Sequence, residues 1–203
     1  MLINDGDTVC VVGGGPGGSA CAMVLLQEAR QLGRKIRVVL IEHKKFSENR
    51  HYNQCIGVLS PPFEDILKNE LDLTLPENLV LNDMEGYCLH SDLLSLDLIG
   101  EESGRSVSVT RSKFDAFMLE EARKAGAEIV HNRVTAIEVN SDGVVIYTEG
   151  DNFKSAVVVG AFGLDDGTCR IFEQGTPYCQ PDFLNTVITR LYPGKEFMQS
   201  MGS

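Results

Sequence analysis

The sequence has no tryptophan, no CxxC pair and no apolar run of the ~20 residues that cross a bilayer. It is also short of basic residues: 18 Lys and Arg face 29 Asp and Glu, a net charge of -11 over 203 residues. This balance argues against nucleic-acid binding, which needs a basic face to replace counterions. The first residues lack the basic region and apolar stretch of a signal peptide. We therefore expect a cytoplasmic protein.

The six cysteines argue against a metal site and against a disulfide framework. They show no metal-ligand spacing with the four histidines. In a chain interpreted as cytosolic they are most simply free thiols. We expect neither a metal site nor a disulfide framework.

A strand–helix–strand pattern occupies the N-terminus. Thr8–Val12 is a short apolar run that stops at glycines, as a buried parallel strand does. Pro16–Leu32 carries apolar residues at helical spacing and ends before Gly33. Ile36–Ile41 is a second β-rich run. Together they predict a right-handed βαβ crossover.

The rest of the chain mixes strands and helices. Ser112 is a candidate cap for a helix that continues to Lys124. Residues 141–143 (SDG) form a candidate hairpin turn. The expected strands are Leu79–Ile99, Ser106–Thr110, Glu128–Val130, Val134–Val139, Val144–Thr148 and Ala156–Val159. The chain is therefore α/β.

The glycine turn between the first strand and the first helix has the form G-x-G-x-x-G, with Gly13, Gly15 and Gly18 at the three positions. In this context the first glycine allows a tight turn, the second admits a pyrophosphate, and the third lets the helix pack closely. Pro16 fits the first helical turn, where its missing N–H costs nothing. The helix N-terminus, with Gly17 in its first turn, then attracts the phosphates. A Gly-rich turn with no ligand is the alternative.

Glu42 directly follows the second strand. A carboxylate at this position accepts hydrogen bonds from ribose hydroxyls and disfavours a 2′-phosphate. The motif therefore predicts a dinucleotide site for FAD or NAD rather than NADP.

Four segments carry a resemblance to a known group of flavoproteins. Residues 11–20 (VVGGGPGGSA), 52–57 (YNQCIG), 111–115 (RSKFD) and 158–163 (VVGAFG) match it in order. The chain resembles the N-terminal half of the p-hydroxybenzoate hydroxylase and geranylgeranyl reductase group. The resemblance implies FAD as the cofactor. It also implies a Rossmann-like, three-layer, glutathione-reductase-like FAD-binding domain, with inserted β-strands from an incomplete substrate domain.

The resemblance also implies roles for particular residues. Cys55 would lie beside the flavin and shape the substrate side, or it is simply a small buried thiol. Phe162 stands where the group usually has Asp, and it either removes a polar contact or packs the strand end. The residues expected to bind the cofactor are Gly13, Gly15, Pro16, Gly17, Gly18, Ser19, Glu42, Arg50, Arg111, Val134, Gly160 and Gly163.

We expect two domains. Residues 1–175 form the FAD-binding domain, within which residues 76–110 form a β insertion on the substrate side. Residues 176–203 begin a substrate domain that the group continues well beyond this length. Phe183–Leu191 is expected to be its first strand, paired with the strands of Leu79–Ile99. A sheet left without its last strand would self-associate through the free edge.

The function expected for the complete protein is an oxidoreductase that reduces or hydroxylates a small hydrophobic organic substrate. Its electron donor would be NAD(P)H or another reductant. One alternative is a non-catalytic fragment that holds FAD only with a missing segment or partner. Another is an NAD-dependent dehydrogenase domain, disfavoured because a loop and β-rich stretch follows Glu42. Flavin-dependent halogenation is a minor option.

Overall fold

A four-stranded parallel sheet lies at the centre of the molecule. The computed structural model describes residues 3–46, 55–99, 104–189, 193–194 and 196–197. The strand order is β12-β1-β2-β8. Strand β1 pairs in parallel register with both β2 and β12, and β2 pairs with β8. The bounds are Thr8–Val12 for β1, Arg37–Ile41 for β2, Glu128–Val130 for β8 and Val157–Gly160 for β12.

The predicted βαβ unit is confirmed. Helix α1 (Pro16–Gln31) connects β1 to β2. Gly15 is its N-cap, and Pro16 occupies the first turn, where proline is tolerated. Residues 9–12 of β1 and residues 38–41 of β2 are buried on both faces, which explains their continuous apolar sequences.

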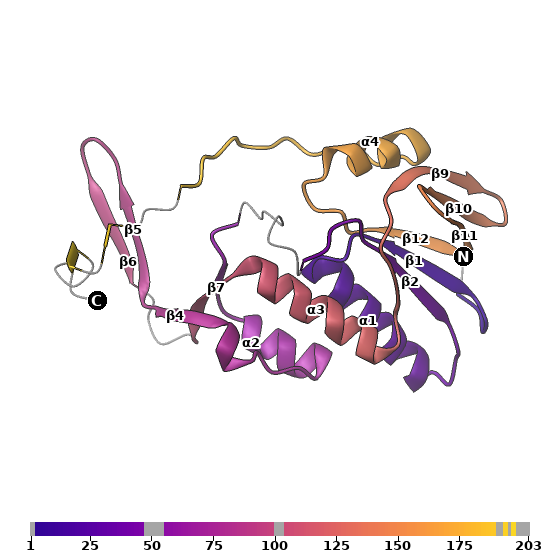
Figure 1. Ribbon diagram of the computed structural model, residues 1–203, viewed down its shortest axis with the longest axis horizontal. Helices are drawn as coiled ribbons and strands as arrows, with labels where there is room; N and C mark the ends of the chain where they lie inside the picture. The colour runs from indigo at the N-terminus through magenta and orange to yellow at the C-terminus, as the bar shows by residue number, and fades with distance from the viewer. Residues whose placement is uncertain (1–2, 47–54, 100–103, 190–192, 195, 198–203) are drawn as a thin grey trace.

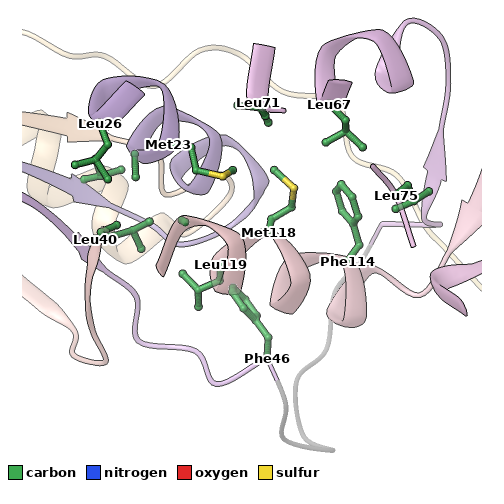
Figure 2. Close-up of a cluster of buried hydrophobic side chains, with 14 of the residues drawn as sticks. Met23, Leu26, Leu40, Phe46, Leu67, Leu71, Leu75, Phe114, Met118 and Leu119 are labelled. Carbon is green, nitrogen blue, oxygen red and sulfur yellow. The ribbon is translucent and has the colours of Figure 1, made fainter. Parts of the chain in front are cut away.

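Helices α1 and α3 (Arg111–Ala125) cover one face of the sheet (Figure 1). Val11, Val38 and Leu40 of the sheet pack in the same apolar cluster as these helices. Figure 2 shows Phe114 and Met118 of α3 directed toward leucines of the segment 67–75. Helix α3 ends at Gly126, whose φ of 109° suits a left-handed C-cap.

An antiparallel meander and helix α4 cover the opposite face (Figure 1). A second apolar cluster lies on this face. It contains Phe172 of α4 and the strand residues that alternate with those of the first cluster, namely Cys10, Val12, Val39 and Ile41. The meander order is β11-β10-β9, with the predicted turn joining β9 to β10. The bounds are Val134–Asn140 for β9, Gly143–Thr148 for β10, Asn152–Ser155 for β11 and Asp166–Gly175 for α4. The three expected layers are therefore present.

A β-rich excursion separates β2 from α3. It contains a three-stranded sheet in the order β3-β7-β4 and a two-stranded hairpin, β5-β6. The hairpin extends away from the main body in Figure 1, and its apolar residues Tyr87, Leu89, Leu96 and Leu98 are exposed. The strand bounds are Val58–Leu59, Val80–Met84, Gly86–His90, Ser95–Ile99 and Ser106–Val109 for β3 to β7. The short helical segments are α2 (Phe63–Asp65), η1 (Ile66–Glu70) and η2 (Glu77–Leu79).

Two local expectations are wrong. Residues 183–189 form no strand, so in the described part of Phe183–Leu191 the expected pairing with the β4–β6 region does not occur. Apolar sequence alone does not make a strand where no neighbouring edge accepts its hydrogen bonds. Ser112 is inside α3 rather than at its N-cap, because Thr110 already has the extended backbone of a cap and Arg111 is helical.

Among the described residues, no helix combines the length and the apolar character that crossing a lipid bilayer requires.

Candidate functional site

Four loops meet at the carboxyl edge of the parallel sheet. Backbone hydrogen bonds join them: Gly13 N donates to Ile41 O at 2.9 Å, and Ala161 N donates to Val12 O at 2.8 Å. Glu42 N donates to Val130 O at 2.9 Å. Ligands of open α/β sheets bind in this location, where the strands end and the helices begin.

At Gly13 and Gly18, in the turn after β1, the chain's own packing requires glycine. Gly13 has a φ of 109°, and a Cβ there would come within 3.0 Å of the backbone of Ala161 and Phe162. A Cβ on Gly18 would overlap the carbonyl oxygen of Gly13. These positions therefore allow the tight turn and the close start of α1.

Gly15 and Gly17 have no such requirement. A Cβ at either position meets nothing within 4 Å, and neither has a positive φ. Gly15 is the N-cap of α1, and Gly17 is in its first turn. Glycine is a favoured N-cap residue, so Gly15 also suits the start of the helix. The backbone of Gly15 and Gly17 is open on the side where a Cβ would lie.

Ser19 lies beneath the same turn. Its side chain is fully buried, and its hydroxyl donates to Gly14 O at 3.0 Å. The hydroxyl therefore holds the turn together, while a contact between Ser19 and a phosphate stays a prediction.

Glu42 is buried and held by two backbone amides. Its Oε2 accepts from Gly14 N at 2.7 Å, and its Oε1 accepts from Lys44 N at 2.6 Å. The carboxylate thus links the glycine turn to the end of β2. Because each carboxylate oxygen has two lone pairs, both oxygens keep acceptor capacity for a ligand's hydroxyl groups.

A pocket opens beside Glu42. Its empty volume is about 340 Å³, part of it open to solvent. The wall combines apolar Val134 and Phe162 with polar His43 and Asp165. Val134, predicted from the resemblance to lie at an adenine edge, is 5% exposed at the start of β9. The structure thus brings Glu42 and Val134 into one site.

His43 and Asp165 are pocket residues that the sequence analysis did not assign. His43 Nδ1 lies 3.5 Å from Glu42 Oε1, and His43 Nε2 lies 4.0 Å from Asp165 Oδ2. Burial lowers the pKa of His43, with only partial compensation from these two carboxylates. Asp165 caps α4 by accepting from Thr168 N at 2.8 Å, and the pKa of Asp165 is lowered because hydrogen bonds from Thr168 outweigh its burial. The D-x-x-T spacing was an available signal for this cap.

The second glycine segment follows β12. A Cβ on Gly160 would collide with the rings of Phe162 and Phe172, whereas Gly163 has open space and a φ of 60°. Phe162 lies 4.8 Å from Phe172 and 5.9 Å from Tyr178 between ring centroids. Phe162 therefore packs the end of the strand and also lines the pocket.

Arg111 and Cys55 meet at the start of α3. Arg111 Nε donates to Asp115 Oδ1 at 3.0 Å, and its side chain also hydrogen-bonds Cys55. Gly57, with a φ of 85°, lies against Arg111 Cγ and Val109 O. Cys55 is half-buried. Arg50, the remaining predicted contact, is outside the described residues.

Helices α1 and α3 begin at the same edge of the sheet. They lie side by side (Figure 1), and Arg30 near the end of α1 donates to Ala125 O at the end of α3. The start of α3 thus shares the sheet edge with the glycine turn. Within the described residues, no group of three or more His, Cys, Asp and Glu side chains is placed to hold a metal ion.

The chain is similar in sequence to a long protein, of which it covers about a third, and to a shorter protein, of which it covers most. Protein FixC of Escherichia coli K12 is 30% identical over 168 residues, which cover 76% of this chain and 36% of FixC. An uncharacterized protein in the nifH2 5′ region of Methanosarcina barkeri is 29% identical over 171 residues, which cover 76% of this chain and 81% of that protein. The chain thus spans about a third of FixC. No protein-family model matches the chain.

Solved structures share the architecture. A geranylgeranyl bacteriochlorophyll reductase-like protein from Thermoplasma acidophilum has a TM-score of 0.59 and 24% identity, over 83% of this chain and 42% of that one. The flavin-dependent brominase Bmp2 has a TM-score of 0.63 and 23% identity, over 81% of this chain and 40% of that one. The chain has the fold of flavin-dependent enzymes. A flavoprotein/dehydrogenase from Cytophaga hutchinsonii has the same fold, with a TM-score of 0.62 and 19% identity over 82% of this chain and 42% of that one. The resemblance to the geranylgeranyl reductase group is confirmed at the level of the fold.

Proposed function

We propose that the chain binds FAD at the carboxyl edge of its parallel sheet and forms the cofactor-binding part of an oxidoreductase. The observation that carries the proposal is the open space over Gly15 and Gly17 at the start of α1. Neither glycine is required by packing, and a helix start with bare backbone is suited to phosphate. The fold shared with flavin-dependent enzymes supports FAD as the dinucleotide.

Each part of the cofactor has a proposed partner. The pyrophosphate would lie over Gly15, and the adenosine ribose would donate its hydroxyls to Glu42. Val134 would face the adenine edge. Arg111 would meet the phosphates or ribityl chain, and Gly163 would approach the same region. The carboxylate of Glu42 would repel a 2′-phosphate, which disfavours NADP.

FAD is preferred over NAD because of the segment after β2. An alternating βα sequence would be expected there in an NAD-binding domain, whereas this chain has an excursion from β3 to β7 before α3. Strands β4 to β7 lie within residues 76–110, the proposed substrate-side insertion. Residues 176–203 remain the proposed start of a substrate domain.

The proposed reaction is reduction or hydroxylation of a hydrophobic organic substrate, with NAD(P)H or another electron donor. Bound FAD would supply the hydride or oxygen transfer, while the chain orients the cofactor and Cys55 borders the substrate side. The alternative is a non-catalytic fragment that holds FAD only with a missing segment or partner, and it predicts that the chain alone loses its flavin on desalting. The brominase among the structural relatives keeps halogenation as a minor option.

The first test is flavin retention by the purified chain. The visible absorption spectrum is recorded before and after FAD addition and desalting. We expect retained flavin bands in the wild type and at least tenfold weaker binding in Gly15→Ala, since the new methyl group would occupy the phosphate space; tenfold corresponds to ~1.4 kcal/mol.

Gly167→Ala is the control for this test. It makes the same glycine-to-alanine change near the start of another helix, in the first turn of α4, where the Cβ meets only Asp165 Oδ1 at 3.4 Å. This variant should bind FAD like the wild type. Equal affinity in Gly15→Ala would count against the phosphate assignment, and colourless wild-type protein would count against FAD binding by this chain.

Self-association through a free sheet edge is a separate part of the proposal. Strands β8 and β12 are the outer strands of the parallel sheet. An edge strand can pair with a second chain. Light scattering at working concentration should give a mass above that of a monomer, and a sharp monomer peak would contradict the idea.

A further inference from the structure

Asp115 is a buried carboxylate that the proposed site does not yet explain. It lies one turn into α3 and is 3% exposed. Burying a carboxylate is costly unless it is paired and hydrogen-bonded. Arg111 supplies that pairing, with Nε donating to Asp115 Oδ1 at 3.0 Å. The two residues therefore form one ion pair, in which Asp115 is buried and Arg111 is partly exposed.

The position of Arg111 is unfavourable for the helix. It is the first residue of α3, and the first turn contains no acidic residue. The N-terminal end of a helix carries a partial positive charge, so a cation there destabilises the helix slightly. The helix dipole thus gives no reason for arginine at this position. A cation added to a helix start makes the location more attractive to an anion.

Arg111 is charged although it is partly buried. Burial works against the charge, but the Asp115 carboxylate and the hydrogen bond with Cys55 outweigh it, so the pKa of Arg111 is raised. Its side chain is 21% exposed, whereas that of Asp115 is 4% exposed. The arginine therefore reaches from the buried carboxylate toward the surface.

The bond to Asp115 restricts the orientation of the guanidinium. A guanidinium has five N–H donors in a rigid fork. Asp115 accepts from Nε, which lies at the base of the fork. Donor capacity therefore remains beyond Asp115 and Cys55, at the start of α3.

We propose that Asp115 is a positioning residue that orients Arg111 toward the phosphates or ribityl chain of the bound dinucleotide. This inference rests on the proposed FAD site. Asp115 does not touch the cofactor itself and acts through Arg111. Asparagine at position 115 keeps an acceptor oxygen for Nε, whereas leucine has a similar shape and no acceptor.

The test measures FAD dissociation constants for the full chain and its variants by flavin fluorescence. The variants are Asp115→Asn, Asp115→Leu, Arg111→Gln and the two double variants. Asp115→Leu should weaken binding about tenfold, the loss of one oriented charged hydrogen bond. Asp115→Asn should recover most of that loss. In the Arg111→Gln background, the difference between Asn and Leu should vanish, because there is no guanidinium left to orient.

Thermal unfolding of each variant identifies losses that come from the fold alone. If Asp115→Leu does not fold, Asp115→Ala replaces it in both backgrounds, because alanine also has no acceptor for Arg111 Nε. Equal FAD affinity for Asp115→Leu and the wild type would overturn the positioning role and leave the proposed function standing. If Asp115→Leu weakens FAD binding by the same factor in the Arg111→Gln background as in the wild-type background, the positioning role is also overturned. Wild-type protein that binds no FAD would overturn both the function and the inference.

Discussion

Glu42 stabilises the glycine turn, and this contribution to the free energy of unfolding can be measured without any ligand. Its two oxygens accept from the amides of Gly14 and Lys44, and the residue is 7% exposed. Glu42→Gln keeps one acceptor oxygen and replaces the other by an NH₂ group. One backbone amide then faces a donor instead of an acceptor. The variant therefore loses one charge-assisted hydrogen bond within the buried turn.

The expected loss of unfolding free energy is about 1.5–3 kcal/mol, the usual contribution of a hydrogen bond to a charged group. For a domain of this size each kcal/mol lowers the melting temperature by roughly 2–4 °C, so we expect a decrease of about 3–12 °C. Chemical denaturation and calorimetry of the ligand-free chain provide both values.

Glu138→Gln is the control for this prediction. Glu138 is exposed and accepts a hydrogen bond from Tyr147 Oη at 3.0 Å. A surface interaction of this kind should change stability by no more than ~0.5 kcal/mol. If Glu42→Gln is as stable as Glu138→Gln, the carboxylate does not hold the glycine turn and the reasoning is wrong.

Two further predictions concern the pocket wall. Burial lowers the pKa of His43, so the unfolded chain takes up this proton first, and the unfolding free energy should fall as pH drops below the ordinary histidine pKa of about 6.5. Denaturation curves at several pH values should show a flatter dependence in His43→Gln, while an unchanged slope would refute the assignment. Phe162→Leu should lose about 0.5–1.5 kcal/mol for each aromatic pair with Phe172 and Tyr178. Phe183→Leu, at a side chain 70% exposed, should be nearly neutral in the same denaturation assay, and equal effects would contradict the packing role.

The N-terminal half of the fold was predictable because its signals are local. The strand Thr8–Val12 and the start of α1 follow from an apolar run, a glycine turn and a proline in the first helical turn. The β9–β10 hairpin follows equally from its turn residues. Phe183–Leu191 failed as a strand because its apolar pattern says nothing about whether an edge is available to pair with it.

The pocket was only partly predictable for a similar reason. Glu42 has a fixed relation to the glycine motif, so its place beside the turn follows from spacing. His43 and Asp165 are 122 positions apart, and they meet only because β2 and β12 end at the same edge. The pairing of Arg111 with Asp115 spans one helical turn and was therefore predictable from the sequence. The burial of Asp115, which makes the pairing important, was not predictable.

The parallel packing of α1 and α3 has an energetic consequence. Two helices lying side by side with their starts together bring like partial charges together, and Arg111, paired with Asp115, lies at the start of α3. A bound anion would offset these partial charges. Any ligand that carries phosphates to this edge therefore also relieves an internal repulsion, so occupancy and resistance to unfolding are thermodynamically linked.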